Sequence, residues 1–234
     1  DMGHATGFQK VGSLSVADNP ERMEELVRGA SMANAFDVDV EVITAEDLCG
    51  RYPLLNPEGI VGGVWLPGDG QASPVDTTMA LAAVAKENGV RILEGVSVER
   101  IRTADGRAIG VDTDQGPIDA EHVVTAAGMW SHQLGRDIGV NIPLHACEHF
   151  YLVTEPIPDL PSGLPVLRDT DNCIYVKEEA GRLLVGAFEP VAKPFGMEGL
   201  PTDRPFMQLD EDWEHLAPVY EAACERIPAL SDVG

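Results

Sequence analysis

Residues 118–156 constrain the fold of this chain more than any other stretch. Val123 and Val124 are β-branched, and a short apolar run of this kind indicates a buried strand. The next three residues (Ala-Ala-Gly) carry almost no side chain, so a ligand can approach the backbone there. Ser131 is a suitable N-cap for a short helix that runs to Asp137. This order predicts a ligand at the carboxyl end of a strand in an open α/β sheet. The alternative is tight packing of the helix on the strand.

Polar residues mark the starts of four expected helices. Asn19 and Ser73 each precede a proline, which suits an N-cap followed by the first helical residue. Thr44 is followed three residues later by an aspartate, as in a capping box. Asp210 or Asp212 can begin a last amphipathic helix. We expect helices from residue 20, over 45–52 and 74–88, and from residue 210 or 212 to just before Pro228.

Alternating and β-branched residues predict strands between these helices. A β-meander is expected around the turn Asp105-Gly106. Residues 62–70, rich in Gly and Pro, predict an irregular loop. Together the elements predict an α/β (α+β) fold with a mixed sheet and a small β-meander. The expected strands cover 11–17, 38–42, 90–98, 101–103, 109–113, 116–118, 122–125, 142–154, 173–178 and 183–187.

The charge of the chain limits the partners that it can have. The 39 acidic and 16 Lys and Arg side chains give a formal net charge of −23, which argues against a nucleic acid or an anionic membrane surface. No apolar run approaches the roughly 20 residues of a membrane helix, so we expect no membrane insertion. The four cysteines form no zinc-type spacing, and we expect no metal site. Reduced thiols in a cytosolic protein are the default.

Strand alternation selects candidate site residues. In the strand expected over 142–154, His149 faces the same way as Tyr151. Tyr175 can line the same surface if its strand belongs to the same sheet. The alternative for both residues is a hydrogen-bonded place in the core. Arg168 and Asp169 are expected to form an ion pair at a turn, and Arg168 is a weaker candidate for binding a substrate carboxylate.

Residues 123–131, the strand at Pro143 and the segment 167–189 together resemble the D-amino-acid-oxidase-like flavoprotein superfamily. Within it, nearly the whole chain resembles the sarcosine and dimethylglycine dehydrogenase group. The resemblance implies a mixed-sheet substrate domain, formed by residues 1–70 and 140–234. It also implies that residues 71–139 are the middle part of an FAD-binding domain.

The resemblance implies FAD as the cofactor. The backbone at Val98 would hold the adenine, the turn Ala126-Ala127-Gly128 would lie close to the dinucleotide, and Trp130 would cover it. Without a flavin, Val98 is simply a sheet residue. No Gly-x-Gly-x-x-Gly follows an expected strand, and that fingerprint seats the pyrophosphate. We therefore expect an internal fragment of a longer enzyme with an incomplete FAD site. Tetrahydrofolate could be used only through further domains.

The resemblance also implies an activity, the oxidative N-demethylation of a methylated amino acid by hydride transfer to flavin. The family's active-site histidine falls on His149, in the pattern His-x-Tyr-x-x-Thr, and its partner tyrosine falls on Tyr175. A histidine suits this role because it can take the proton of an amine at neutral pH. The expected partner is a small N-methyl amino acid, and the electron acceptor is left open. The expected compartment is the bacterial cytoplasm, or the mitochondrial matrix in a eukaryote.

Two alternatives remain open. The first is a related oxidase or dehydrogenase for another amine or for glycerol phosphate, because fold does not fix substrate. The second is a non-catalytic, flavoprotein-like binding subunit.

Overall fold

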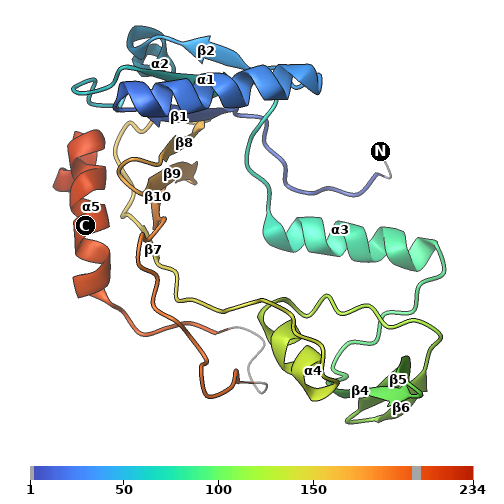
Figure 1. The fold of residues 1–234 in the computed structure, drawn as a ribbon. Coiled ribbons are helices and arrows are strands. Elements are labelled where there is room, and N and C mark those ends of the chain that lie inside the picture. The colour runs from blue at the N-terminus through green and yellow to red at the C-terminus, as the bar shows by residue number, and fades with distance from the viewer. Residues whose placement is uncertain (1–2, 202–206, 234) are drawn as a thin grey trace. The chain divides into compact units, whose positions relative to one another are not determined.

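A computed structural model describes residues 3–201 and 207–233, which divide into two compact units (Figure 1). Unit 1 holds the described residues up to Val84, His149–Val191, and those from Glu211 onward. Unit 2 holds Ala85–Glu148 and the described part of Ala192–Asp210. The chain changes unit near residues 84, 148, 191 and 210, whereas we expected domain boundaries near residues 70 and 139.

Unit 1 is built on a seven-stranded sheet with the order β2-β3-β1-β8-β9-β10-β7. β1 and β8 pair in parallel and the other neighbours are antiparallel, so the predicted mixed sheet is confirmed. β1 (blue) and β8 (orange) are far apart in sequence but lie side by side (Figure 1). The strands are β1 (Ser13–Ala17), β2 (Glu41–Ile43), β3 (Gly62–Leu66), β7 (Tyr151–Val153), β8 (Val166–Asp169), β9 (Ile174–Glu179) and β10 (Arg182–Ala187).

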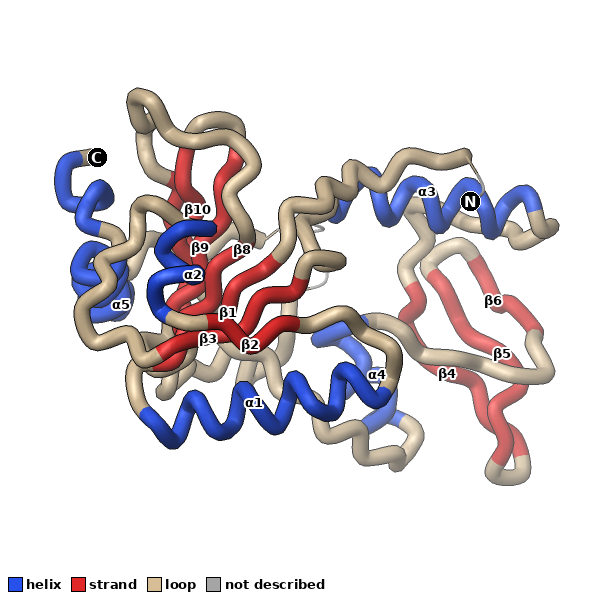
Figure 2. The backbone as a smooth tube through the Cα atoms, turned by 90° about the horizontal axis from the view of Figure 1, so that it is seen from above, coloured by secondary structure: helices blue, strands red, loops and turns tan. Residues whose placement is uncertain are grey.

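The two faces of this sheet differ. The core face is buried against α2 (Ala45–Arg51) and α5 (Trp213–Arg226), which Figure 2 shows packed beside the strands. Its side chains include Leu14, Leu167, Ile174, Val176 and Val185, which are at most 1% exposed. The opposite face, here called the open face, carries a row of directly paired residues, Ser15, Arg168, Tyr175, Gly186 and Tyr151.

Helix α1 (Pro20–Ala35) covers only part of the open face. Its Ala30 packs with Val64 of β3, the direct neighbour of Ser15. Beyond Ser15 the row is less covered, because Arg168, its direct neighbour, and Tyr151, at the far end, are both exposed. The β8, β9, β10 and β7 portion of the open face therefore remains accessible to a ligand.

The predicted helix starts are confirmed. Asn19 accepts a hydrogen bond from Arg22 N, and Thr44 forms a capping box with Asp47. Ser73 Oγ accepts from Asp76 N at the start of α3 (Pro74–Glu87). Asp212 accepts from His215 N and so begins α5, which ends before the 3₁₀ helix η2 (Pro228–Asp232).

The described residues of unit 2 include the predicted β-meander, a 3₁₀ helix and a short α-helix. β4 (Val98–Ala104), β5 (Arg107–Thr113) and β6 (Gly116–Asp119) form a three-stranded antiparallel sheet. Asp105 and Gly106 both have positive φ (50° and 74°), as a tight hairpin turn requires. The 3₁₀ helix η1 (Gly128–Trp130) leads into α4 (Ser131–Asp137). Ser131 is the first residue of α4 rather than its cap.

The buried strand expected at Val123 and Val124 is wrong. Residues 122–127 form no strand, and Val124 is 86% exposed. In the described part of the chain, no strand pairs with this segment, so an extended backbone has no ladder of hydrogen bonds there. The β-branched residues favour a strand locally, but a strand also needs a neighbouring strand to pair with.

The expected loop over 62–70 is also wrong in its first half, which is β3. A Cβ on Gly63 would overlap the Ser15 carbonyl oxygen, so this glycine permits close strand pairing rather than a turn. Three other expected strands are shorter than predicted. Residues 38–42 yield only β2, β4 begins at Val98 instead of residue 90, and β7 pairs with β10 only over Tyr151–Val153.

The expected ion pair of Arg168 with Asp169 is wrong, because adjacent strand residues point to opposite faces. Asp169 is fully buried on the core face and binds Arg226 of α5, with Nε and Oδ2 2.8 Å apart. A second nitrogen of Arg226 lies 2.6 Å from Asp18 Oδ1. Arg226 also donates to the carbonyl oxygens of Asn56 and Glu58. This buried network ties α5 to the strand ends.

Candidate functional site

The structure brings His149 and Tyr175 together on the open face of unit 1. Tyr175 lies in β9 and pairs with Gly186 of β10. His149 lies two residues before β7. The ring centroids of His149 and Tyr175 are 6.3 Å apart and their planes differ by 17°, so the rings are stacked. The pairing expected from strand alternation is present, and the catalytic roles stay a prediction.

Tyr175 is held in place by a glycine and an aromatic neighbour. Its ring lies over Gly186, where any Cβ would overlap the ring carbons. Besides His149, its ring also contacts Phe188, whose ring centroid is 5.1 Å away. The absence of a side chain at Gly186 therefore leaves the space that the Tyr175 ring occupies, which explains a glycine inside a strand.

Glu189 binds the imidazole of His149. Its Oε2 lies 2.8 Å from His149 Nδ1, and its Oε1 accepts a hydrogen bond of 3.1 Å from Phe150 N. The Glu189 side chain is 5% exposed, whereas that of His149 is 49% exposed. Burial alone would raise the pKa of Glu189, but the backbone N–H groups of Glu189 and Phe150 and the His149 ring outweigh burial and lower that pKa. Glu189 is therefore ionised at neutral pH.

The hydroxyl of Tyr175 keeps its proton at neutral pH. Burial raises the pKa of Tyr175, and the nearby charges of Glu189 and Tyr151 raise it further. A protonated phenol can donate a hydrogen bond to a ligand on the open face.

Arg168 lies beside this pair. It is exposed on β8, and its Cα pairs directly with that of Tyr175. Among residues 3–201 and 207–233, no carboxylate lies within ion-pair distance of Arg168. Its guanidinium is thus available to a carboxylate on the same face.

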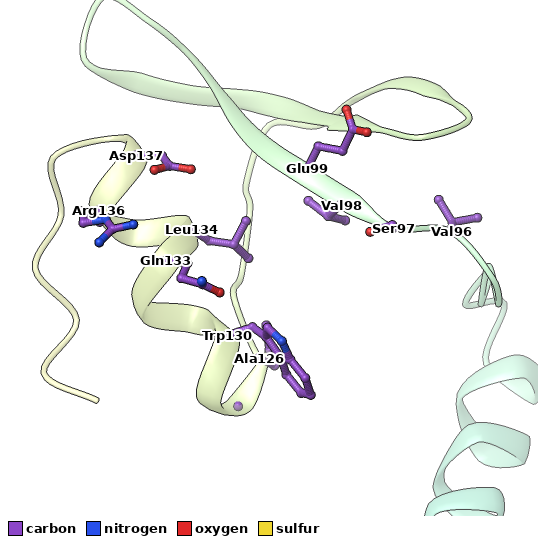
Figure 3. Close-up of a pocket in the computed structure, with 12 residues that line it drawn as sticks. Val96, Ser97, Val98, Glu99, Ala126, Trp130, Gln133, Leu134, Arg136 and Asp137 are labelled. Atoms are coloured by element: carbon purple, nitrogen blue, oxygen red, sulfur yellow. The ribbon is translucent and has the colours of Figure 1, made fainter. Parts of the chain in front are cut away.

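Unit 2 contains a cavity of about 960 Å³ between α4 and the start of β4 (Figure 3). All five residues that the family resemblance assigned to FAD line it, namely Val98, Ala126, Ala127, Gly128 and Trp130. Trp130 Nε1 donates to Pro201 O at 2.8 Å, which fixes the indole.

The chemistry of this cavity fits the adenine end of a dinucleotide. Val98 is 43% exposed at its edge, and a Cβ on Gly128 would meet no atom within 4 Å. Glu99, Arg136 and Asp137 also line the cavity, and its apolar side chains, aromatic ring and open space beside the backbone suit a flat heteroaromatic group. Among the described residues, no group of three or more His, Cys, Asp or Glu is placed to hold a metal ion.

Glu189 is the residue of this site that sequence reasoning missed. It lies 40 positions from His149 and two residues after β10. An acidic residue beyond a strand end carries no signal of its own. Only the register of β10 between β7 and β9 predicts that it can reach the histidine.

The fold and these two sites define a class of protein. The class combines a mixed sheet that carries a His–Tyr pair on its open face with a second unit whose cavity suits a dinucleotide. The chain belongs to the FAD dependent oxidoreductase (DAO) family, which matches residues 1–234.

The curated relatives agree with the predicted group. The chain is 38% identical over 232 residues to 4-methylaminobutanoate oxidase (formaldehyde-forming) of Paenarthrobacter nicotinovorans, covering 99% of this chain and 28% of that protein. It is 34% identical over 239 residues to human mitochondrial sarcosine dehydrogenase, covering 100% of this chain and 26% of that protein. It is 37% identical over 233 residues to the mitochondrial pyruvate dehydrogenase phosphatase regulatory subunit of Mus musculus, covering 98% of this chain and 26% of that protein. The chain spans about a quarter of the length of these relatives.

A solved structure supports the fold. L-proline dehydrogenase from P. horikoshii superposes with a TM-score of 0.83 at 26% identity, over 97% of this chain and 59% of that one. The predicted resemblance to the superfamily, and to its sarcosine and dimethylglycine dehydrogenase group, is thereby confirmed. None of the described helices is both long and apolar enough to cross a membrane.

Proposed function

We propose that this chain is the substrate-binding part, with a portion of the FAD-binding part, of an enzyme that oxidatively demethylates an N-methyl amino acid. The observation that carries this proposal is the stacked His149–Tyr175 pair on the open face. Additional support comes from the identities of 38% and 34% to 4-methylaminobutanoate oxidase and sarcosine dehydrogenase.

Three residues on the open face have a part in this reaction. Arg168 binds the substrate carboxylate through its guanidinium. His149 takes the proton from the substrate ammonium group, which frees the nitrogen lone pair. Tyr175 donates a hydrogen bond that orients the amine.

FAD supplies the acceptor for the hydride that leaves the N-methyl carbon. In unit 2, Val98, Trp130 and the turn 126–128 would hold its adenine end. Water then adds to the oxidised methyl carbon, and formaldehyde and the demethylated amine leave.

The test is the rate of flavin reduction in the complete protein, followed anaerobically by stopped flow. We expect His149→Ala to lower this rate by about 10²–10⁴, as for the loss of one general base. Higher pH should partly rescue the variant because more substrate is then free amine. His122→Ala, an exposed histidine of unit 2, is the matched control and should leave the rate unchanged. A wild-type rate for His149→Ala at neutral pH would show that this histidine is not the base.

A panel of substrates decides among related activities. Sarcosine, dimethylglycine, 4-methylaminobutanoate and glycerol phosphate should be compared as reductants of the bound flavin. Reduction by glycerol phosphate alone would favour the related oxidase over the demethylating enzyme.

A non-catalytic binding subunit is the second candidate. The observation that favours it is the 37% identity to a regulatory subunit, which nearly equals the identity to the oxidase. A complete protein that holds no flavin, or whose flavin no member of the panel reduces, would support this candidate.

A further inference from the structure

We propose that Glu189 is a positioning residue that fixes the tautomer of His149, so that the lone pair of Nε2 points to the open face. This inference rests on the proposed function of His149 as a base. Glu189 itself touches no substrate in this scheme.

Each oxygen of the Glu189 carboxylate makes a hydrogen bond. Oε2 lies 2.8 Å from His149 Nδ1, and Oε1 accepts from Phe150 N at 3.1 Å. With the side chain only 5% exposed, few other orientations are open to it. His149 has no such enclosure, because its side chain is 49% exposed and, among the described residues, its ring stacks only on Tyr175. The carboxylate is thus the contact that sets the rotation of the imidazole.

The charge of Glu189 settles which ring nitrogen carries the hydrogen. An ionised carboxylate only accepts hydrogen bonds, so Nδ1 of His149 must be the donor. In the neutral ring the lone pair is then on Nε2, the nitrogen on the far side of the ring from Glu189. A base on the open face needs this arrangement, since the other tautomer would present an N–H to the substrate amine.

The other titratable groups near the pair do not compete for this role. Besides burial, the charges that act on Tyr175 of β9 are those of Glu189 and of Tyr151 of β7. The pKa of Tyr175 is raised, so it stays a neutral phenol while Glu189 is ionised. Glu189 is therefore the negative charge that the His149 ring meets.

Glu189→Gln separates positioning from packing because it keeps the shape and removes the charge. The amide oxygen can accept from Phe150 N only if the amide NH₂ group turns toward His149. That group would donate to Nδ1 and place the ring hydrogen on Nε2, the wrong tautomer for a base. Glu189→Asp keeps the negative charge on a side chain that is shorter by one methylene. It should therefore retain much of the effect of Glu189 on the His149 tautomer.

The experiment measures the tautomer and the reaction in the complete protein. Histidine is labelled with ¹⁵N, the side-chain nitrogen signals are recorded above neutral pH, and His149→Ala assigns the signal. We expect a protonated Nδ1 in the wild type and in Glu189→Asp, and a protonated Nε2 in Glu189→Gln. Flavin reduction should fall about 10²-fold or more in Glu189→Gln, less in Glu189→Asp, and not at all in the control Glu179→Gln, a surface carboxylate paired with Lys177.

The outcomes separate this inference from the proposed function. A protonated Nδ1 in Glu189→Gln together with a wild-type rate would overturn the inference and leave the role of His149 intact. A tautomer change in Glu189→Gln while His149→Ala reduces flavin normally would support the positioning contact and overturn the proposed role of His149. Equal rate losses in the Gln and Asp variants without a tautomer change would mean that Glu189 acts only through packing.

Discussion

Two carboxylate side chains of unit 1 are almost inaccessible to solvent, and each is bound to a basic side chain on its own face of one sheet. On the core face, Asp169 is fully buried and its partner Arg226 is 7% exposed. On the open face, Glu189 is 5% exposed and its partner His149 is 49% exposed. The two carboxylates are alike in burial, and the difference lies in their partners.

This difference indicates what each pair can do. Arg226 uses four of its five N–H donors on two carboxylates and two carbonyl oxygens, and its side chain is only 7% exposed. Such a closed network can stabilise the fold but cannot bind a ligand. His149 uses one ring nitrogen on Glu189, and no group in the described part of the chain is hydrogen-bonded to the other. A buried carboxylate bound to a half-exposed histidine is thus an arrangement that suits proton transfer to and from a ligand.

The largest effect is expected from Arg226→Met. The substitution leaves Asp169 buried without its positive partner, and breaking a buried pair from one side costs about 3–5 kcal/mol. Chemical denaturation of the complete protein measures this loss. The matched control is Arg168→Met, the arginine next to Asp169 on the open face, which should change stability by less than about 0.5 kcal/mol. If Arg226→Met and Arg168→Met lower the free energy of unfolding equally, the distinction between the two faces is wrong.

A smaller effect is expected from Gly186→Ala. The new methyl group would displace the Tyr175 ring, and overpacking of this kind costs about 1–3 kcal/mol. Flavin reduction should fall along with stability, since Tyr175 leaves its place beside His149. Gly50→Ala in α2, where a Cβ meets no atom within 4 Å, should instead stabilise by up to about 1 kcal/mol. Unchanged turnover in Gly186→Ala would show that the position of Tyr175 is not critical.

Tyr175→Phe should have a smaller effect again. The ring stays in place over Gly186 and only the hydroxyl is lost. One hydrogen bond from this hydroxyl to the substrate contributes about 0.5–1.5 kcal/mol. We expect flavin reduction to slow by about tenfold at most, with an unchanged melting temperature. A loss as large as that of His149→Ala would assign Tyr175 a part in proton transfer.

The smallest effects concern pH, and they have opposite signs on the two faces. The pKa of Glu189 is lowered in the fold, so its stabilisation is present above its usual 4.5 and is lost as the pH falls through the lowered value. The pKa of Asp18 beside Arg226 is raised, by burial first and by the charge of Asp169 second. Its stabilisation is present below the usual 3.8 and is lost as the pH rises.

Unfolding free energies of the wild type, Glu189→Gln and Asp18→Asn across the acid range check these signs. Relative to Glu189→Gln, the wild type should gain stability with rising pH. Relative to Asp18→Asn, it should lose stability with rising pH. Slopes of the same sign would contradict the contrast between the faces.

Local signals of the sequence predicted the parts of the fold that depend on local contacts. The caps at Asn19, Thr44, Ser73 and Asp212 satisfy backbone donors within three residues, so their residue types suffice to predict them. The meander around Asp105-Gly106 pairs neighbours in sequence and was predicted for the same reason. Strand formation at Val123 failed because a strand depends on a partner that local preference does not reveal.

The same distinction applies to the site. The period of two along a strand predicted that His149 and Tyr175 share a face. It could not predict Glu189, or the binding of Asp169 by Arg226, because these contacts join residues 40 and 57 positions apart. Burial, which decides the role of each carboxylate, arises only when distant elements pack.

The order of the chain gives α5 a particular importance during synthesis. The core face of the sheet stays uncovered on one side until α5 leaves the ribosome. At about 5–20 residues per second, residues 188–226 take roughly 2–8 s to add. During that time the apolar strands β9 and β10 are exposed and can associate with other nascent chains. A truncated product that ends before α5 should therefore aggregate or be held by a chaperone, even though every strand of its sheet has been made.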